Sequence, residues 1–109
     1  MAWLIRGEQV LASLEVADSF ASRGKGLLGR DNFDGALLIK PARGIHTIGM
    51  RFAIDVAFCN QKMIVIDMVR MVPNRVGRIR LGARSIIEAQ AGAFERWNLS
   101  VDDQLEVRA

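Results

Sequence analysis

Ile54-Asp55-Val56-Ala57-Phe58-Cys59 and Met63–Met71 are two strongly apolar runs joined across the polar dipeptide Asn60-Gln61. In the first run, Ile54, Val56 and Phe58 alternate with the other three residues, which is the period of a β-strand. The short polar connection predicts that the two runs form a β-hairpin. The second run is apolar on both faces, so we expect it to lie in the centre of a sheet.

Similar short runs recur along the rest of the chain, and residues that favour turns separate them. The predicted strands are Ala2–Arg6, Gln9–Val16, Ala36–Lys40, Ile54–Cys59, Met63–Met71, an edge strand at Arg78–Leu81, Ser85–Ala89 and Gln104–Arg108. One or two helical turns are expected at Ala91–Trp97, with Asn98 in the left-handed closing position. These elements predict a mainly β (α+β) fold, a small antiparallel β-barrel or sandwich with two short helices.

A second helix is predicted over residues 19–28, where Asp18 or Ser19 can cap its start and Gly29 can end it. Two glycines inside this span each cost about 1 kcal/mol of helix stability relative to alanine. We therefore expect the helix to depend on tertiary packing or to break near Gly24.

Gly24-Lys25-Gly26-Leu27-Leu28-Gly29 matches the G-x-G-x-x-G spacing of dinucleotide-binding loops. That role needs the first glycine directly after a strand, in a chain of alternating strands and helices. Here Ala17–Arg23 separate the motif from the preceding strand, and no such alternation follows. The spacing therefore favours a helix break or close packing, and we predict no cofactor.

The composition limits the kinds of protein to consider. The chain has 109 residues, 50% hydrophobic and 25% charged, which fits one folded domain over residues 1–109. The single cysteine, Cys59, excludes an intramolecular disulfide, and the single histidine, His46, excludes a multi-histidine metal site. The N-terminus lacks a signal-peptide pattern, and no apolar stretch approaches the roughly 18–20 residues of a membrane span. We expect a soluble protein of the reducing cytoplasm, without a membrane partner.

Positive charge is concentrated in one segment. The net charge is +3, yet residues 68–87 contain five bases and no acid, so the rest of the chain is slightly negative. This arginine segment contains Arg70, Arg75, Arg78, Arg80 and Arg84. It predicts either a surface that binds anions or nucleic acid, or an ordinary solvated loop and strand face. No aromatic residue lies between Phe58 and Phe94, which disfavours stacking on single-stranded bases.

The segment from His46 to Asp55 holds the densest group of functional residue types, with Thr47, Met50 and Arg51 between its ends. A site here would place the imidazole of His46 and the guanidinium of Arg51 at a cleft, with Asp55 orienting one of them. The structural alternative is a half-buried, hydrogen-bonded His46 and an Asp55 that accepts backbone N–H bonds to fix a loop.

Other chemistries find less support in the sequence. A metal site from His46, Asp55 and Cys59 would lack the usual ligand spacing. Cys59 would need His46 nearby to act as a nucleophile, and its place at the end of an apolar strand favours an inert core residue. No Gly-x-Ser-x-Gly motif is present. We therefore assign no catalytic or metal-ligating residue.

Several blocks of the chain resemble a widespread prokaryotic family, domain of unknown function 192. The blocks are Glu15–Ser19, Arg23–Arg30, Ile45–Phe58, Glu88-Ala89 with Ala91-Gly92, and Asp102–Leu105. The resemblance covers nearly the whole chain and implies a compact β-rich fold with short helices, but no activity. The chain departs from the family pattern at Ala53, where proline is usual, and at Asn98 and Asp102, where glycine is usual.

Three functional hypotheses remain open. The first is a non-catalytic binding module, in which the His46–Asp55 loop and the arginine segment frame a groove for an anionic small molecule, a peptide or a protein partner. The second is an enzyme of unknown reaction class, with His46 as acid or base, Asp55 as orienter and Arg51 as anion holder. The third is a nucleic-acid accessory protein whose arginines contact phosphates. The candidate binding residues are His46, Thr47, Arg51, Asp55, Arg78 and Arg80.

Overall fold

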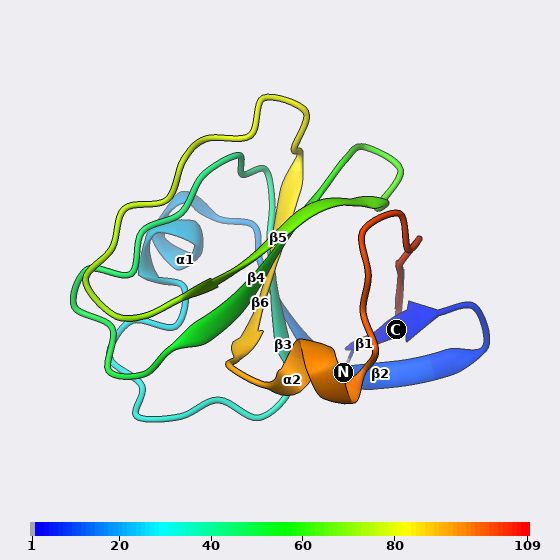
Figure 1. Cartoon of the computed structure of the whole chain (residues 1–109), viewed down its shortest axis with the longest axis horizontal. Coiled ribbons are helices and arrows are strands. Elements are labelled where there is room, and N and C mark those ends of the chain that lie inside the picture. The colour runs from blue at the N-terminus through cyan, green and yellow to red at the C-terminus, as the bar shows by residue number, and fades with distance from the viewer. Residues whose placement is uncertain (1) are drawn as a thin grey trace.

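The computed structural model describes residues 2–109, which form seven strands and two short helices (Figure 1). The strands are β1 (Ala2–Arg6), β2 (Gln9–Ala17), β3 (Ala36–Ile39), β4 (Ile54–Cys59), β5 (Val65–Met71), β6 (Ser85–Gln90) and β7 (Glu106–Arg108). The helices are α1 (Phe20–Lys25) and α2 (Ala93–Arg96). Seven of the eight predicted strands are therefore present, with their ends shifted by at most two residues.

The strands form one mixed sheet in the order β5-β4-β6-β3-β2-β1-β7. All neighbouring pairs are antiparallel except β2 and β3, which run parallel because the crossover between them contains α1. Within residues 2–109 the edge strands β5 and β7 do not pair, although Ile64 and Gln104 form an isolated bridge beside them. The predicted class, mainly β with two short helices, is confirmed, as an open sheet with one parallel pair.

β4 is buried along its whole length, and its alternation divides the core into two clusters. Ile54, Val56 and Phe58 face one cluster, as predicted, and Ala57 and Cys59 face the other. The first cluster, on the α1 side, includes Ala17, Leu27, Leu37, Ile39, Met50 and Ile86. The second, on the α2 side, includes Leu4, Leu14, Leu38, Ile87, Phe94 and Trp97. The sheet is therefore covered on both faces.

The prediction that Met63–Met71 is a central strand is wrong, because β5 lies at the edge of the sheet. Its apolar residues still pack on both faces of the sheet, because Met68 contacts the α2-side cluster and Val69 contacts the α1-side cluster. A sheet covered on both faces needs apolar residues on both sides of its strands. The pattern therefore indicated the covering of both faces and not the position within the sheet.

Ser19 begins α1 with a capping box, in which Ser22 N donates to Ser19 Oγ and Ser19 N donates to Ser22 Oγ. The helix ends at Lys25, because Gly26 adopts a φ of 49° that leaves the α-helical path. The predicted span 19–28 is therefore too long, and the predicted break falls just past Gly24. Neither helix in the described part of the chain is long and apolar enough to cross a membrane.

The edge strand predicted at Arg78–Leu81 does not form. The segment is a loop held at Arg80, whose backbone N–H donates to Arg43 O and whose Nε donates to Asp67 Oδ2 at 2.9 Å. Ile79 and Leu81 remain exposed. The prediction fails because the apolar residues of this alternating pattern face solvent instead of a core.

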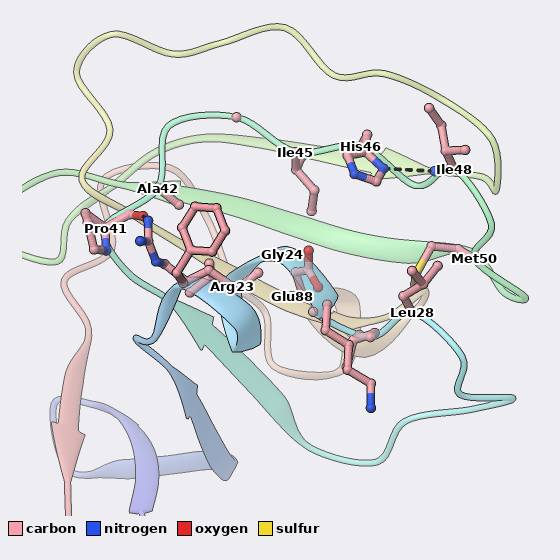
Figure 2. A pocket seen from close by; sticks show the side chains of 16 residues that line it. Arg23, Gly24, Leu28, Pro41, Ala42, Ile45, His46, Ile48, Met50 and Glu88 are labelled. Atoms are coloured by element: carbon pink, nitrogen blue, oxygen red, sulfur yellow. Dashed lines mark hydrogen bonds between the residues drawn. The ribbon is translucent and has the colours of Figure 1, made fainter.

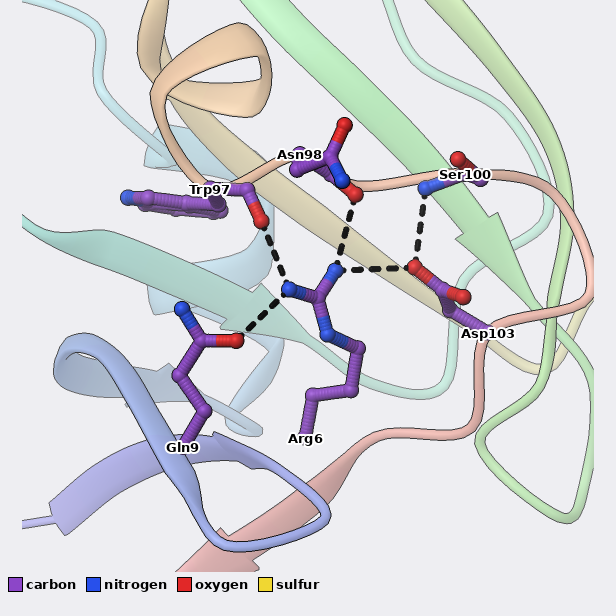
Figure 3. Close-up of polar contacts among 6 residues, drawn as sticks. All are labelled: Arg6, Gln9, Trp97, Asn98, Ser100 and Asp103. Atoms are coloured by element: carbon purple, nitrogen blue, oxygen red, sulfur yellow. Dashed lines mark hydrogen bonds and ion pairs between the residues drawn. The ribbon is translucent and has the colours of Figure 1, made fainter.

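Arg6, at the end of β1, ties the first strand to the last part of the chain (Figure 3). Its guanidinium donates to Trp97 O at 2.8 Å and Asn98 O at 2.9 Å, and it pairs with Asp103 Oδ2 at 3.0 Å. Asn98 has a φ of 54°, which confirms the predicted left-handed closing position. The planar, many-donor guanidinium suits this convergence of acceptors.

Candidate functional site

Glu88 places a carboxyl group in an otherwise apolar part of the sheet. It lies on β6 between its ladder partners Leu37 of β3 and Val56 of β4, and it shares a face with Ile86. Glu88 is 3% exposed, and its Oε1 is buried without a hydrogen-bond partner in the described structure. This burial raises the pKa of Glu88 to about 7. The carboxyl group therefore changes charge near neutral pH.

A cavity of about 340 Å³ lies over this carboxyl group (Figure 2), and we call it the Glu88 cavity. One side is formed by α1 and the turn after it, and the other by residues 41–50. β3 contributes Ile39, and β6 contributes Glu88. Glu88 is the only acid among lining residues that are mostly apolar, and the other lining residues that can carry charge are Arg23, Lys25 and His46.

Gly26 brings the backbone close to the Glu88 carboxyl group. A Cβ atom at Gly26 would lie 3.5 Å from Glu88 Oε1, in contact with it. The φ of 49° at Gly26 is also one that side chains rarely adopt. One glycine of the G-x-G-x-x-G spacing is thus explained by a helix end that passes beside a buried acid.

Arg23 supplies the second unpartnered polar atom of the cavity. Its Nη1 donates to Pro41 O at 3.1 Å, whereas its Nε is buried without a partner. Within residues 2–109, Arg23 Nε and Glu88 Oε1 are the two buried side-chain polar atoms without a partner, and both residues line this cavity. Buried polar groups are normally paired, so two residues with unpaired polar atoms on the wall of one cavity make that cavity a candidate ligand site.

His46 stands at the rim of the same cavity. Its Nδ1 accepts a hydrogen bond from Ile48 N at 3.2 Å, which places the proton of the neutral ring on Nε2. The ring is exposed, so its Nε2–H is free to donate to a molecule in the cavity. Of the predicted site residues, His46 is the one that lines the same cavity as Glu88.

Thr47, next to His46, is fully buried and holds two loops together. Its hydroxyl group donates to Val72 O at 2.7 Å and accepts from Arg75 N at 2.9 Å. Both of its hydrogen-bonding roles are therefore used within the protein, and Thr47 does not line the cavity beside it.

Asp55 takes the structural role that the sequence allowed. Its Oδ2 accepts backbone N–H bonds from Gly92 and Phe94, and its Oδ1 accepts from Arg70 Nε. His46 is not among its partners, and the two residues line different cavities. The arrangement does not support Asp55 as the orienter of a catalytic histidine.

The remaining predicted residues lie apart from the Glu88 cavity. Arg51 pairs with Asp31 at 2.8 Å on the exposed surface. A separate open depression of about 500 Å³ is lined by Arg70, Arg75, Arg78 and Arg80 together with apolar residues of β5 and the following loop. Arg80 is already engaged, because it pairs with Asp67 and lies 4.1 Å over the ring centre of Phe58. Its hydrogen bond lowers the pKa of Asp67.

Cys59 is buried, and this burial raises the pKa of its thiol to about 12. The thiol therefore stays protonated at neutral pH. In the described part of the chain, no three His, Cys, Asp or Glu residues gather as metal ligands. The set of His46, Asp55 and Cys59 considered from the sequence is thus not assembled.

Sequence reasoning missed Glu88 and Arg23 as site residues. The available signal was the run Ser85-Ile86-Ile87-Glu88-Ala89, in which an acid shares a strand face with Ile86. Arg23 gave no signal, because its contact with the cavity depends on how α1 packs against the sheet.

Comparison with known proteins adds the family to this geometry. Residues 3–107 match the model of domain of unknown function 192, described as an uncharacterised family. A UPF0127 protein of Pyrococcus furiosus is 29% identical over 106 residues, covering 93% of this chain and 91% of the relative. A UPF0127 protein of Thermococcus sibiricus is 30% identical over 107 residues, covering 93% of this chain and 70% of the relative.

Two solved structures share the fold. A protein of unknown function from Novosphingobium aromaticivorans has a TM-score of 0.82 and 18% identity, covering 96% of this chain and 82% of that one. A protein from Sinorhizobium meliloti, described as a candidate transcription regulator, has a TM-score of 0.82 and 19% identity, covering 97% and 91%. The family match and the relatives agree over nearly the whole chain, which belongs to the domain of unknown function 192 family.

Proposed function

We propose that this protein is a non-catalytic binding module that takes a small organic ligand into the Glu88 cavity. The observation that carries this proposal is the buried carboxyl group of Glu88, which lines that cavity and whose Oε1 has no hydrogen-bond partner in the described structure. The volume of about 340 Å³ suits a small metabolite. Access is open on the side of His46 and Ile48, which are both exposed.

Fold stability gives no reason to keep Glu88. An unsatisfied buried polar group costs roughly 1–3 kcal/mol, and a leucine or glutamine there would avoid burying an ionisable group. A ligand that donates a hydrogen bond to the carboxyl group would offset this cost in the bound state. The His46 Nε2–H at the rim offers a second polar contact.

A fragment screen by protein NMR tests the proposal. We expect fragments with an N–H or O–H donor to shift the amide signals of Gly26 and Ile45, which line the cavity. A fragment at a hundred times its dissociation constant should add about 2.7 kcal/mol of stability. Both effects should be lost in Glu88→Leu and kept in the control Glu95→Gln, whose acid is exposed and outside the cavity. The proposal is contradicted if fragments bind Glu88→Leu as tightly as the unchanged protein, or if no fragment shifts the amide signals of Gly26 and Ile45.

A second candidate follows from the depression of about 500 Å³ lined by four arginines. We propose it as a weaker site for anionic partners, in which Arg75 and Arg78 make the contacts because neither is held by an acid in the described structure. A labelled poly-glutamate peptide and a labelled DNA oligomer distinguish protein from nucleic-acid partners. Binding should weaken with salt and with the double change Arg75→Gln and Arg78→Gln, but not with Arg108→Gln. Absence of binding at low salt contradicts this candidate.

A further inference from the structure

Building on the proposed function, we infer that the ligand of the Glu88 cavity is a zwitterion, whose ammonium group binds Glu88, whose carboxylate binds Arg23, and whose body is apolar. Free α-amino acids with aliphatic or thioether side chains have this chemistry. The inference concerns the kind of ligand, so it can fail while the cavity remains a binding site.

The first step concerns the partner of Glu88. A buried carboxylate is best stabilised by a cation that also donates hydrogen bonds. No base within residues 2–109 forms an ion pair with Glu88, and Arg23 turns its Nη1 to the carbonyl of Pro41 instead. A cation that complements the ionised Glu88 would therefore come from the ligand, and a primary ammonium is a compact cation that donates hydrogen bonds.

The second step concerns the positive groups. Arg23 and Lys25 of α1 line the same cavity as Glu88, whereas β3 contributes only Ile39. Arg23 Nε is a buried donor without a partner. A ligand that carried only a positive charge would meet these bases without compensation. A carboxylate on the same ligand would pair with Arg23 and so balance the positive charge of that side chain.

The third step concerns the body and size of the ligand. Leu28, Ile45 and Met50 line the cavity, and Figure 2 shows Leu28 and Met50 on the side of Glu88 away from Arg23, where the apolar side chain of an amino acid would lie. Phe20, which is 88% exposed, also lines the cavity. A water molecule occupies about 30 Å³, so 340 Å³ accommodates on the order of ten non-hydrogen atoms. Leucine and methionine, with nine each, are of this size.

The ionisation of Glu88 predicts how the affinity for the ligand should depend on pH. Ammonium binding needs the ionised carboxylate, and burial raises the pKa of Glu88 to about 7. The ionised fraction rises about tenfold from pH 6 to pH 8, so the affinity should rise about tenfold as well. Imidazole groups also titrate near neutral pH. The pH series must therefore be repeated in His46→Gln, where the dependence should persist.

The experiment is calorimetric titration with L-leucine and two matched analogues. 3-Methylbutylamine lacks only the carboxylate, and 4-methylpentanoic acid lacks only the ammonium group. We expect L-leucine to bind at least about tenfold more tightly than either analogue, since each loses one charged contact. Glu88→Gln and Arg23→Gln should each lower the affinity for L-leucine by about tenfold or more. The control Lys62→Gln, which lies outside the cavity, should leave this affinity unchanged. NMR shifts at Gly26 and Ile45 of the unchanged protein locate the binding without any variant.

The outcomes separate the two proposals. If an analogue binds as tightly as L-leucine, the zwitterion is wrong and the cavity remains a binding site. If neither L-leucine nor L-methionine binds but donor fragments do, the zwitterion is again wrong and the proposed function stands. If neither amino acids nor fragments bind, both proposals fail. An L-leucine affinity that does not change between pH 6 and pH 8 contradicts the role of Glu88 as the ammonium partner.

Discussion

Asp55 and Arg70 stand opposite each other in the ladder between β4 and β5, with Asp55 Oδ1 2.9 Å from Arg70 Nε. The other carboxylate oxygen accepts the backbone N–H groups of Gly92 and Phe94, at 2.9 and 3.2 Å. One carboxylate, only 4% exposed, thus connects the edge strand β5 and α2 to β4. The Arg70 guanidinium remains about half exposed.

Replacing this carboxylate should weaken the fold. We expect Asp55→Ala to lower the free energy of unfolding by about 2–4 kcal/mol, mainly because it leaves the N–H groups of Gly92 and Phe94 without their acceptor. The ion pair adds less, since Arg70 is half exposed. Urea unfolding measures the change. The control Glu95→Gln removes only an exposed partner of Arg70 and should cost less than about 1 kcal/mol. Equal losses in both variants would contradict the anchoring role of Asp55.

The Thr47 hydroxyl group offers a second test of the loops around the cavity. Thr47→Val keeps the shape but leaves Val72 O and Arg75 N without their buried partner. We expect a loss of about 1–3 kcal/mol in the free energy of unfolding. Thr47→Ser, which keeps the hydroxyl group, should lose less. The hydroxyl contacts would be unimportant if the two variants were equally stable in thermal or urea melts.

Glu88 should make stability depend on pH. Its pKa is raised from 4.5 to about 7 in the folded protein, so the folded state holds the proton more tightly than the unfolded chain. The resulting stabilisation is complete below pH 4.5 and is lost as the pH rises through 7, a change of about 3 kcal/mol. Urea unfolding across this range should show that Glu88→Gln gains stability relative to the unchanged protein as the pH rises. If the free energies of unfolding of the two proteins changed in parallel with pH, Glu88 would not be the source of the pH dependence.

Cys59 should be chemically silent in the folded protein. Its thiol is fully buried, and burial raises its pKa to about 12. We expect a thiol reagent at pH 8 to modify it only as fast as the protein unfolds. Modification followed with and without urea measures this difference. Rapid labelling without denaturant would show that the α2-side cluster opens locally.

Particular residues show which parts of the fold and of the candidate site could be predicted from the sequence. The alternation of Ile54, Val56 and Phe58 predicted β4 and its two faces because strand periodicity is local. The edge position of β5 was not predictable in this way, since it depends on which strands pair. The same limit hid Glu88, whose significance comes from Leu37 and Val56, its neighbours from two other strands. Local patterns report burial, whereas the chemistry of the candidate site depends on long-range pairing.

The pairing of β1 with β7 also has a consequence for biosynthesis. Trp3 is paired with Arg108, and Arg6 finds Trp97, Asn98 and Asp103 only in the last part of the chain. On the ribosome, the hairpin of β1 and β2 can form early, but the outer edge of β1 is covered only after β7 has been made. Such contacts, distant in sequence, slow folding. We therefore expect the speed at which residues 97–108 are translated to influence how much of the newly made protein reaches its native state.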